Sequence, residues 1–123
     1  MSLPPDITAF IRNQFRSVWT LEVLLFLKSH PDDSFQSADL VQRLRASDAI
    51  VSSCLNMLQA GGLIVMDEEG AARYAPASPE LGALADETHK LYVAKPDAVR
   101  RLIVMAANSG LAAFSDSFQL WRK

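Results

Sequence analysis

Apolar residues recur at intervals of three and four along most of this chain, which is the spacing of one face of an α-helix. The pattern predicts a first helix opened by Pro4-Pro5-Asp6. A nearly continuous apolar run from Trp19 to Leu27 follows, and we expect a central buried helix there. Pro31 should end it, because the residue before a proline avoids helical geometry. The pattern leaves open whether Ser17 caps this second helix or the first helix runs straight through.

Two shorter helices and a hairpin are predicted next. Ser37 and Ser47 each precede an apolar-periodic segment, and a serine hydroxyl can accept hydrogen bonds from backbone N–H groups one turn on. The second of these helices should end at Gly61-Gly62, since glycine permits a left-handed C-terminal turn. The β-prone runs 63–67 and 73–75, joined through Glu68-Glu69-Gly70, predict a β-hairpin.

The rest of the chain is predicted to be helical. Ser78-Pro79-Glu80 has the residue types of a helix start, and Pro96 separates this helix from another. A last apolar stripe follows a bend at 108–110. The expected fold class is therefore mainly α with a small β-hairpin (α+β). At 123 residues, the chain is expected to form a single domain, 1–123.

The order of these elements carries a family resemblance. It is helix, helix, tight turn, helix, Gly-Gly-Leu-Ile and hairpin, and residues 37–76 read SADLVQRLRASDAIVSSCLNMLQAGGLIVMDEEGAARYAP. From Trp19 to Pro76 the chain resembles the winged helix-turn-helix superfamily, most closely the small MarR-like bacterial transcriptional regulators. The resemblance implies a winged-helix core over about 17–77, with flanking helices in 1–16 and 78–123. It also implies a DNA-binding transcriptional regulator that acts as a homodimer.

The resemblance makes the segment Ser47–Gln59 a recognition helix. Its polar side chains would face the base edges of duplex DNA, where amide side chains can bond adenine in a bidentate manner. Arginines before the tight turn and on the returning strand would contact phosphates. The expected DNA-binding residues are Arg43, Arg45, Ser47, Ser52, Ser53, Asn56, Gln59 and Arg73.

Charge argues for an alternative. Residues 31–70 hold seven acidic residues against two arginines, a net charge of −5, and no Lys or Arg lies between Ala46 and Ala72. In the resembled family, the positions matching Ser53 and Met66 are often basic. Phosphate neutralisation supplies much of DNA affinity, so an acidic face is poorly suited to DNA. The alternative function is a winged-helix protein–protein interaction module that binds a basic protein partner and no DNA.

The terminal helices have two interpretations. They either pack onto the domain's own core or form a dimer interface, as terminal helices do in the resembled regulators. Large aromatic residues are favoured in interface cores. Residues 95–123 carry a net charge of +3, which can guide association between copies. The expected interface residues are Ile7, Phe10, Phe15, Leu111, Phe114, Phe118 and Trp121.

Other chemistry has little support in the sequence. Cys54 has no basic residue nearby to activate it, so we expect a packed structural cysteine. No His, Cys and Asp spacing suits a metal, no glycine-rich phosphate loop is present, and no catalytic set is evident. We therefore expect no cofactor and no enzyme activity. The most apolar runs are too short to span a bilayer and no signal peptide is evident, which predicts a cytoplasmic protein without membrane contact.

Overall fold

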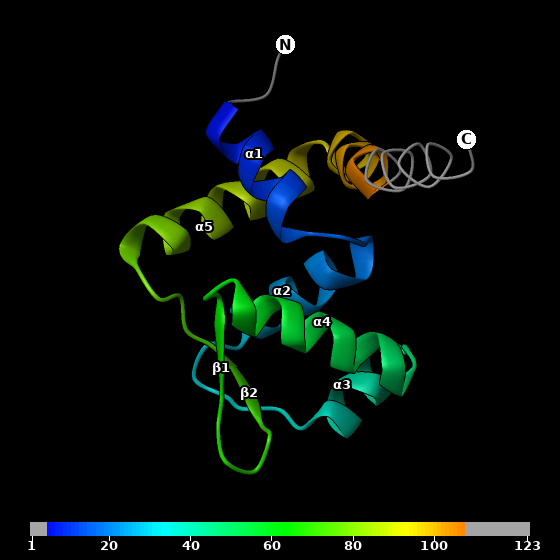
Figure 1. Cartoon of the computed structure of the whole chain (residues 1–123), viewed down its shortest axis with the longest axis vertical. Coiled ribbons are helices and arrows are strands. Elements are labelled where there is room, and N and C mark those ends of the chain that lie inside the picture. The colour runs from blue at the N-terminus through cyan, green and yellow to red at the C-terminus, as the bar shows by residue number, and fades with distance from the viewer. Residues whose placement is uncertain (1–4, 108–123) are drawn as a thin grey trace, which may run out of the picture.

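The computed structural model describes residues 5–107, which are mainly helical with one small antiparallel sheet (Figure 1). This confirms the predicted α+β class with its hairpin. Residues 96–107 are also helical, whereas the predicted last helix lies outside the described residues. The named elements are α1 (Pro5–Gln14), α2 (Val18–Ser29), α3 (Ser37–Leu44), α4 (Asp48–Ala60), β1 (Ile64–Met66), β2 (Ala72–Tyr74) and α5 (Pro79–Ala94).

The chain breaks between α1 and α2, which decides the question that the sequence left open. Ser17 has an extended backbone, and its hydroxyl accepts a hydrogen bond from the backbone N–H of Thr20 at 3.3 Å. This satisfies one of the N–H groups that lack a helical partner in the first turn. The apolar stripe of α1 and the apolar run of α2 therefore belong to two separate helices.

Serine capping is as predicted for two of three helices. Ser47 and Ser78 accept from the backbone N–H groups of Ile50 and Leu81, each at 3.2 Å. The prediction for Ser37 is wrong by one residue, because α3 begins at Ser37 and Gln36 is its N-cap. The Asp39 carboxylate instead accepts from the Gln36 backbone N–H at 3.3 Å, one half of a capping box.

The core forms around α2, which packs against α4. Leu21, Val23, Leu24 and Leu27 are fully buried, as expected for the apolar run, while Trp19 at its start keeps an exposed fraction of 37%. Leu40 of α3 and Val51, Leu55 and Leu58 of α4 close over them. Each such side chain contributes about 1.5–3 kcal/mol when it leaves water, so this cluster holds the helix pair α3–α4 on α2.

The hairpin is tied to the segment before α3. β1 pairs with β2 in antiparallel register, with Val65 opposite Arg73. Phe35 adds an isolated bridge to Ala72, through N–H to carbonyl hydrogen bonds of 2.9 and 2.8 Å. Gly70 takes a positive φ of 84° in the connecting turn, which glycine adopts without steric cost. The hairpin therefore has a fixed position relative to α3.

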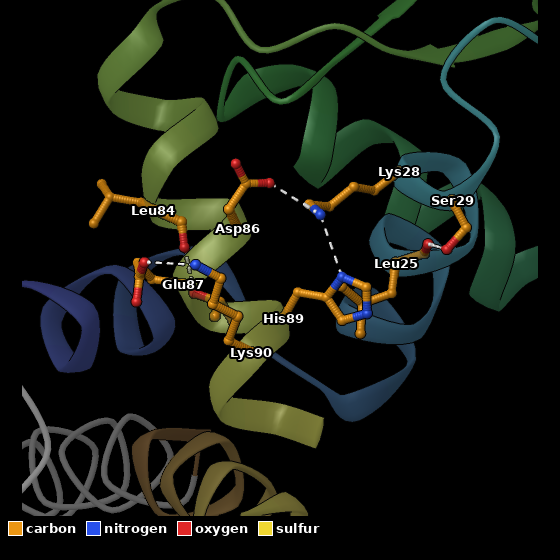
Figure 2. Close-up of polar contacts among 9 residues, drawn as sticks. Leu25, Lys28, Ser29, Leu84, Asp86, Glu87, His89 and Lys90 are labelled. Carbon is orange, nitrogen blue, oxygen red and sulfur yellow. Dashed lines mark hydrogen bonds and ion pairs between the residues drawn. The ribbon is translucent and has the colours of Figure 1, made fainter. Parts of the chain in front are cut away.

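Helix α5 is fixed to α2 by polar contacts. Figure 2 shows the Lys28 ammonium between Asp86 and His89, with Nζ 2.9 Å from the Asp86 carboxylate and 3.2 Å from the His89 Nδ1. One turn further along, the Tyr92 hydroxyl donates to the Glu22 carboxylate at 2.6 Å. As a result, α1, α5 and residues 96–107 gather at one end of the molecule and the hairpin projects from the other (Figure 1).

Candidate nucleic-acid interface

The outward face of α4 consists of polar and small side chains. The helix buries Val51, Cys54, Leu55 and Leu58 on one side, and helical periodicity places the polar set on the other. The exposed residues of this outward face are Asp48, Ala49, Ser52, Ser53, Asn56, Gln59 and Ala60. The structure therefore brings together Ser52, Ser53, Asn56 and Gln59, the predicted base-contacting residues.

Ser47 stands at the start of this helix with its hydroxyl oxygen already in use. The oxygen accepts from the Ile50 N–H as the N-cap of α4. The hydroxyl hydrogen is still available to donate, and the residue is exposed. Ser47 thus has a structural role that any contact with a ligand would have to share.

Arg45 forms the turn between α3 and α4 in an unusual backbone conformation. It is the C-cap of α3, with φ 56° and ψ 40°, and among the described residues it alone has a positive φ without being glycine. The left-handed region costs a residue with a Cβ about 1–2 kcal/mol. Its side chain is exposed beside the start of α4. A strained conformation at an exposed cation is a reason to look for function there.

Arg43 has partners within the chain. Its guanidinium lies over the ring of Phe35 at 5.5 Å and over the ring of Phe26 at 5.9 Å from the centroids. Guanidinium groups stack favourably on aromatic faces. These contacts direct Arg43 toward α2 and the segment before α3, so the structure does not group it with the outward residues of α4.

Arg73 lies on the hairpin and is exposed, opposite the exposed Val65. The hairpin tip next to it is acidic. Asp67 is needed for the turn, because its Oδ1 accepts from the backbone N–H groups of Glu69 and Ala71, both at 2.9 Å. Glu68 and Glu69 extend into solvent without such a role for their side chains. The tip therefore presents two carboxylates that do not support the fold.

Sequence reasoning missed Arg16. It lines a hollow of about 360 Å³ between the start of α2 and α4, together with Ser53 and Ala49. The outward face of α4 has no basic residue of its own, and Arg16 places an exposed cation at its edge. Only the break at Ser17 brings Arg16 there, and the sequence left that break undecided.

Cys54 is buried at 3% exposure, as predicted. Burial raises the pKa of its thiol, and hydrogen bonds from Thr20 and Ser17 offset this only in part. The Thr20 hydroxyl lies 3.6 Å from the Cys54 Sγ. The thiol therefore stays protonated at neutral pH and joins α4 to α2, and its nucleophilicity is low.

No group of three or more His, Cys, Asp or Glu residues within 5–107 could hold a metal ion.

The predicted dimer residues divide into three groups. Phe15 is buried at 1% exposure and makes an edge-to-face contact with Phe10, with ring centroids 5.7 Å apart. Ile7 and Phe10 are also buried, at 7% and 9% exposure, and border an open groove between α1 and α5. The four other members, Leu111, Phe114, Phe118 and Trp121, lie outside the described residues.

Comparison with known proteins does not assign a family or a function to the chain. No family model, curated protein or solved structure matches the chain. Across residues 5–107 there is also no helix with the length and apolar character to cross a membrane. The functional argument therefore depends on the contacts and charges described above.

Proposed function

We propose that this chain is a winged-helix DNA-binding protein that acts as a homodimeric transcriptional regulator in the cytoplasm, similar to the MarR-like bacterial regulators. The observation that carries the proposal is the sequence of elements around α4. Helices α3 and α4 follow each other through a tight turn, α4 leaves its polar side exposed, and the hairpin follows at once. The Phe35–Ala72 bridge supports the proposal because it holds the hairpin against the helix pair.

The composition of the α4 face favours base edges over a protein surface. Asn56 and Gln59 can each bond adenine through two hydrogen bonds, and Ser52 and Ser53 can donate or accept. Protein interfaces, in contrast, are usually centred on large aromatic or aliphatic side chains. The exposed part of α4 carries none of these. In this proposal the side chains of α4 contact bases and Arg45 and Arg73 contact phosphates, with Arg16 at the edge.

Few cations are available on this face, so the expected salt dependence of DNA binding can be calculated from their number. Arg43 is stacked on two rings, so each copy offers Arg45 and Arg73 as the main phosphate contacts. For a dimer with four such contacts, the slope of log K against log salt should be about −4. This is a weak salt dependence compared with that of strong DNA binders.

The first experiment is a salt titration of duplex binding. Fluorescence anisotropy with a pool of labelled random-sequence duplexes, at about 50 to 200 mM salt, should give this slope. Arg45→Ala and Arg73→Ala should each lower the magnitude of the slope by about 2, since each removes one contact per copy. Arg101→Ala, an exposed arginine outside this face, is the control and should change nothing. A wild-type protein that retains no duplex at about 50 mM salt would remove DNA binding from the proposal.

The acidic hairpin tip favours the second candidate, a winged-helix module that binds a basic protein. Glu68 and Glu69 are exposed and unneeded for the turn, and Asp48 adds a third carboxylate at the start of α4. A basic partner should lose affinity for the Glu68→Gln/Glu69→Gln variant. Asp67 must stay in this test because it holds the turn. Unchanged affinity of a captured partner would exclude the hairpin tip as its binding site.

A further inference from the structure

Trp19, at the start of α2, is the only Phe, Tyr or Trp among residues 5–107 whose side chain is exposed. Tryptophan is enriched among the few residues that carry most of the binding energy of protein interfaces. Such residues typically lie beside pockets that side chains of the partner fill. The surroundings of Trp19 therefore decide whether its exposure marks a binding surface.

Two open hollows lie against Trp19, which lines both of them. The first has a volume of about 430 Å³ and lies between α2 and the end of α3, where Val18 and Leu44 are its apolar lining. The second is the hollow of about 360 Å³ between the start of α2 and α4, and Ile50 and Met57 contribute apolar surface to it. These four side chains are half-buried. Together with Trp19 they form an apolar surface with two recesses, the Trp19 surface.

The charged side chains that line the two hollows are Arg16, Arg43 and Glu22. Both arginines are exposed, and within the described part of the chain neither makes an ion pair. The stacking of Arg43 on two aromatic rings leaves its charge without a counter-ion. The Glu22 carboxylate, in contrast, already accepts the Tyr92 hydroxyl at 2.6 Å. The Trp19 surface therefore has a positive rim, which is complementary to carboxylates.

We propose that the Trp19 surface binds an acidic peptide segment of a partner protein. Large apolar side chains of the segment fill the two hollows on either side of the interface, and its carboxylates pair with Arg16 and Arg43. A guanidinium can hold a carboxylate through two parallel hydrogen bonds, so these pairs fix the position of the segment. This partner is opposite in charge to the basic protein considered for the hairpin tip. It also uses a different surface, because neither hollow includes a residue of the hairpin.

The composition of the Trp19 surface favours a peptide over a nucleic acid. Two arginines are few for a phosphate backbone, whose binding depends on many cations. Four apolar side chains around a tryptophan suit the core of a protein interface instead. The second hollow shares Ala49 and Ser53 with the outward face of α4, so the bound segment would lie beside that face. The inference is independent of whether the α4 face binds DNA.

A selection with a random-peptide phage library on the full chain tests the proposal. The library is first depleted on Trp19→Ala and then selected on the wild-type protein. Enriched peptides should have a net negative charge and contain tryptophan, phenylalanine or leucine. Labelled synthetic copies are then titrated by fluorescence anisotropy, and Trp19→Ala should weaken their binding at least about tenfold. The circular dichroism spectrum of Trp19→Ala should match that of the wild-type protein, because the side chain is exposed.

Arg16→Glu tests the charge of the surface with the tryptophan in place. It should weaken binding of the same peptides about three- to tenfold at low salt, and the difference should shrink near 1 M salt because charges are then screened. Arg101→Glu is the matched control, with the same charge change at an exposed arginine that lines neither hollow. Val93→Ala is the control for Trp19→Ala, since it removes an exposed apolar side chain elsewhere. Both controls should bind the peptides as the wild-type protein does.

Three results would overturn the proposal. If no peptide binds the wild-type protein more tightly than it binds Trp19→Ala, the Trp19 surface is not a docking site. Enriched peptides that are neutral or basic, or equal losses in Arg16→Glu and Arg101→Glu, contradict an acidic partner. A single-stranded oligo(dT) that binds the wild-type protein and loses affinity in both Trp19→Ala and Arg16→Glu assigns the surface to nucleic acid instead. Duplex binding by the wild-type protein is scored separately and decides the DNA proposal alone.

Discussion

The chain enters α4 through Arg45, which has a φ of 56°, and leaves it through Gly62, which has a φ of 77°. Glycine adopts this region freely, whereas arginine does so at a cost in conformational free energy. After α4, the positive φ is sufficient to explain why residue 62 is a glycine. Before α4, Arg45 places a long cationic side chain where glycine would be more stable. The difference supports a functional role for the Arg45 guanidinium beside the polar face of α4.

The largest expected effect comes from removing the glycine of this pair. Gly62→Ala should lower the free energy of unfolding by about 1–3 kcal/mol, because alanine is strained at this positive φ. The added Cβ would also lie 3.3 Å from both Ala77 and Leu81. Urea denaturation followed by circular dichroism measures the change.

Gly82→Ala is the control for that substitution. Gly82 lies inside α5, and the nearest atom to an added Cβ is in Pro76 at 3.6 Å, an ordinary contact. Alanine is the better helix former by about 1 kcal/mol, so this variant should be more stable than the wild-type protein. Equal losses at Gly62 and Gly82 would show that the conformation of Gly62 has no special importance.

The next effect is smaller and opposite in sign. Arg45→Gly should raise the free energy of unfolding by about 1 kcal/mol, because it removes the left-handed strain. The same variant should bind duplex DNA more weakly. Arg45→Lys keeps both the strain and the charge, so its stability and most of its affinity should match those of the wild-type protein.

These two readouts separate backbone from side chain. Chemical denaturation reports the strain, and anisotropy at about 50 mM salt reports the charge. If Arg45→Gly destabilises the protein, the guanidinium supports the fold and its position is no indication of DNA contact.

The features around α4 that the sequence predicts are those set by local chemistry. Ser47, Gly62 and Gly70 act on their immediate neighbours, so the sequence was sufficient to predict the start of α4, its end and the hairpin turn. Arg45 has no such signal, since nothing about an arginine indicates a left-handed conformation. That conformation closes the C-terminal end of α3, where the backbone N–H groups of Arg45 and Ala46 both donate to the Val41 carbonyl.

Contacts between distant segments account for what the sequence could not predict. The stacking of Arg43 needs Phe26 and Phe35 on two other segments, and it gives this exposed side chain partners within the chain. Arg16 reaches the edge of α4 only because the chain breaks at Ser17. The periodicity of one segment cannot predict the stacking of Arg43 or the position of Arg16, because both depend on how the segments are placed relative to one another.

The hairpin turn differs from the two turns at α4, because a side chain and a glycine share its support. The hairpin turn combines Gly70, which supplies the positive φ, with Asp67, whose carboxylate accepts two backbone N–H groups. Glu68 and Glu69 between them are exposed, so Glu68→Lys/Glu69→Lys should change stability by less than about 0.5 kcal/mol. Asp67→Ala, in contrast, should cost about 1 kcal/mol, because it leaves those N–H groups to solvent.

The same double variant measures how strongly the hairpin acids oppose DNA. If the hairpin lies near phosphates, Glu68→Lys/Glu69→Lys should raise duplex affinity about three- to tenfold at low salt, and the gain should vanish near 1 M salt because the charges are screened. Glu68→Gln/Glu69→Gln removes the charges without reversing them and should give an intermediate gain. A graded, salt-sensitive series would place the hairpin beside DNA, as Arg73 on the same hairpin requires. A flat series would separate Arg73 from Arg45, leaving only the turn before α4 as a phosphate contact and favouring a basic protein as the partner of the hairpin.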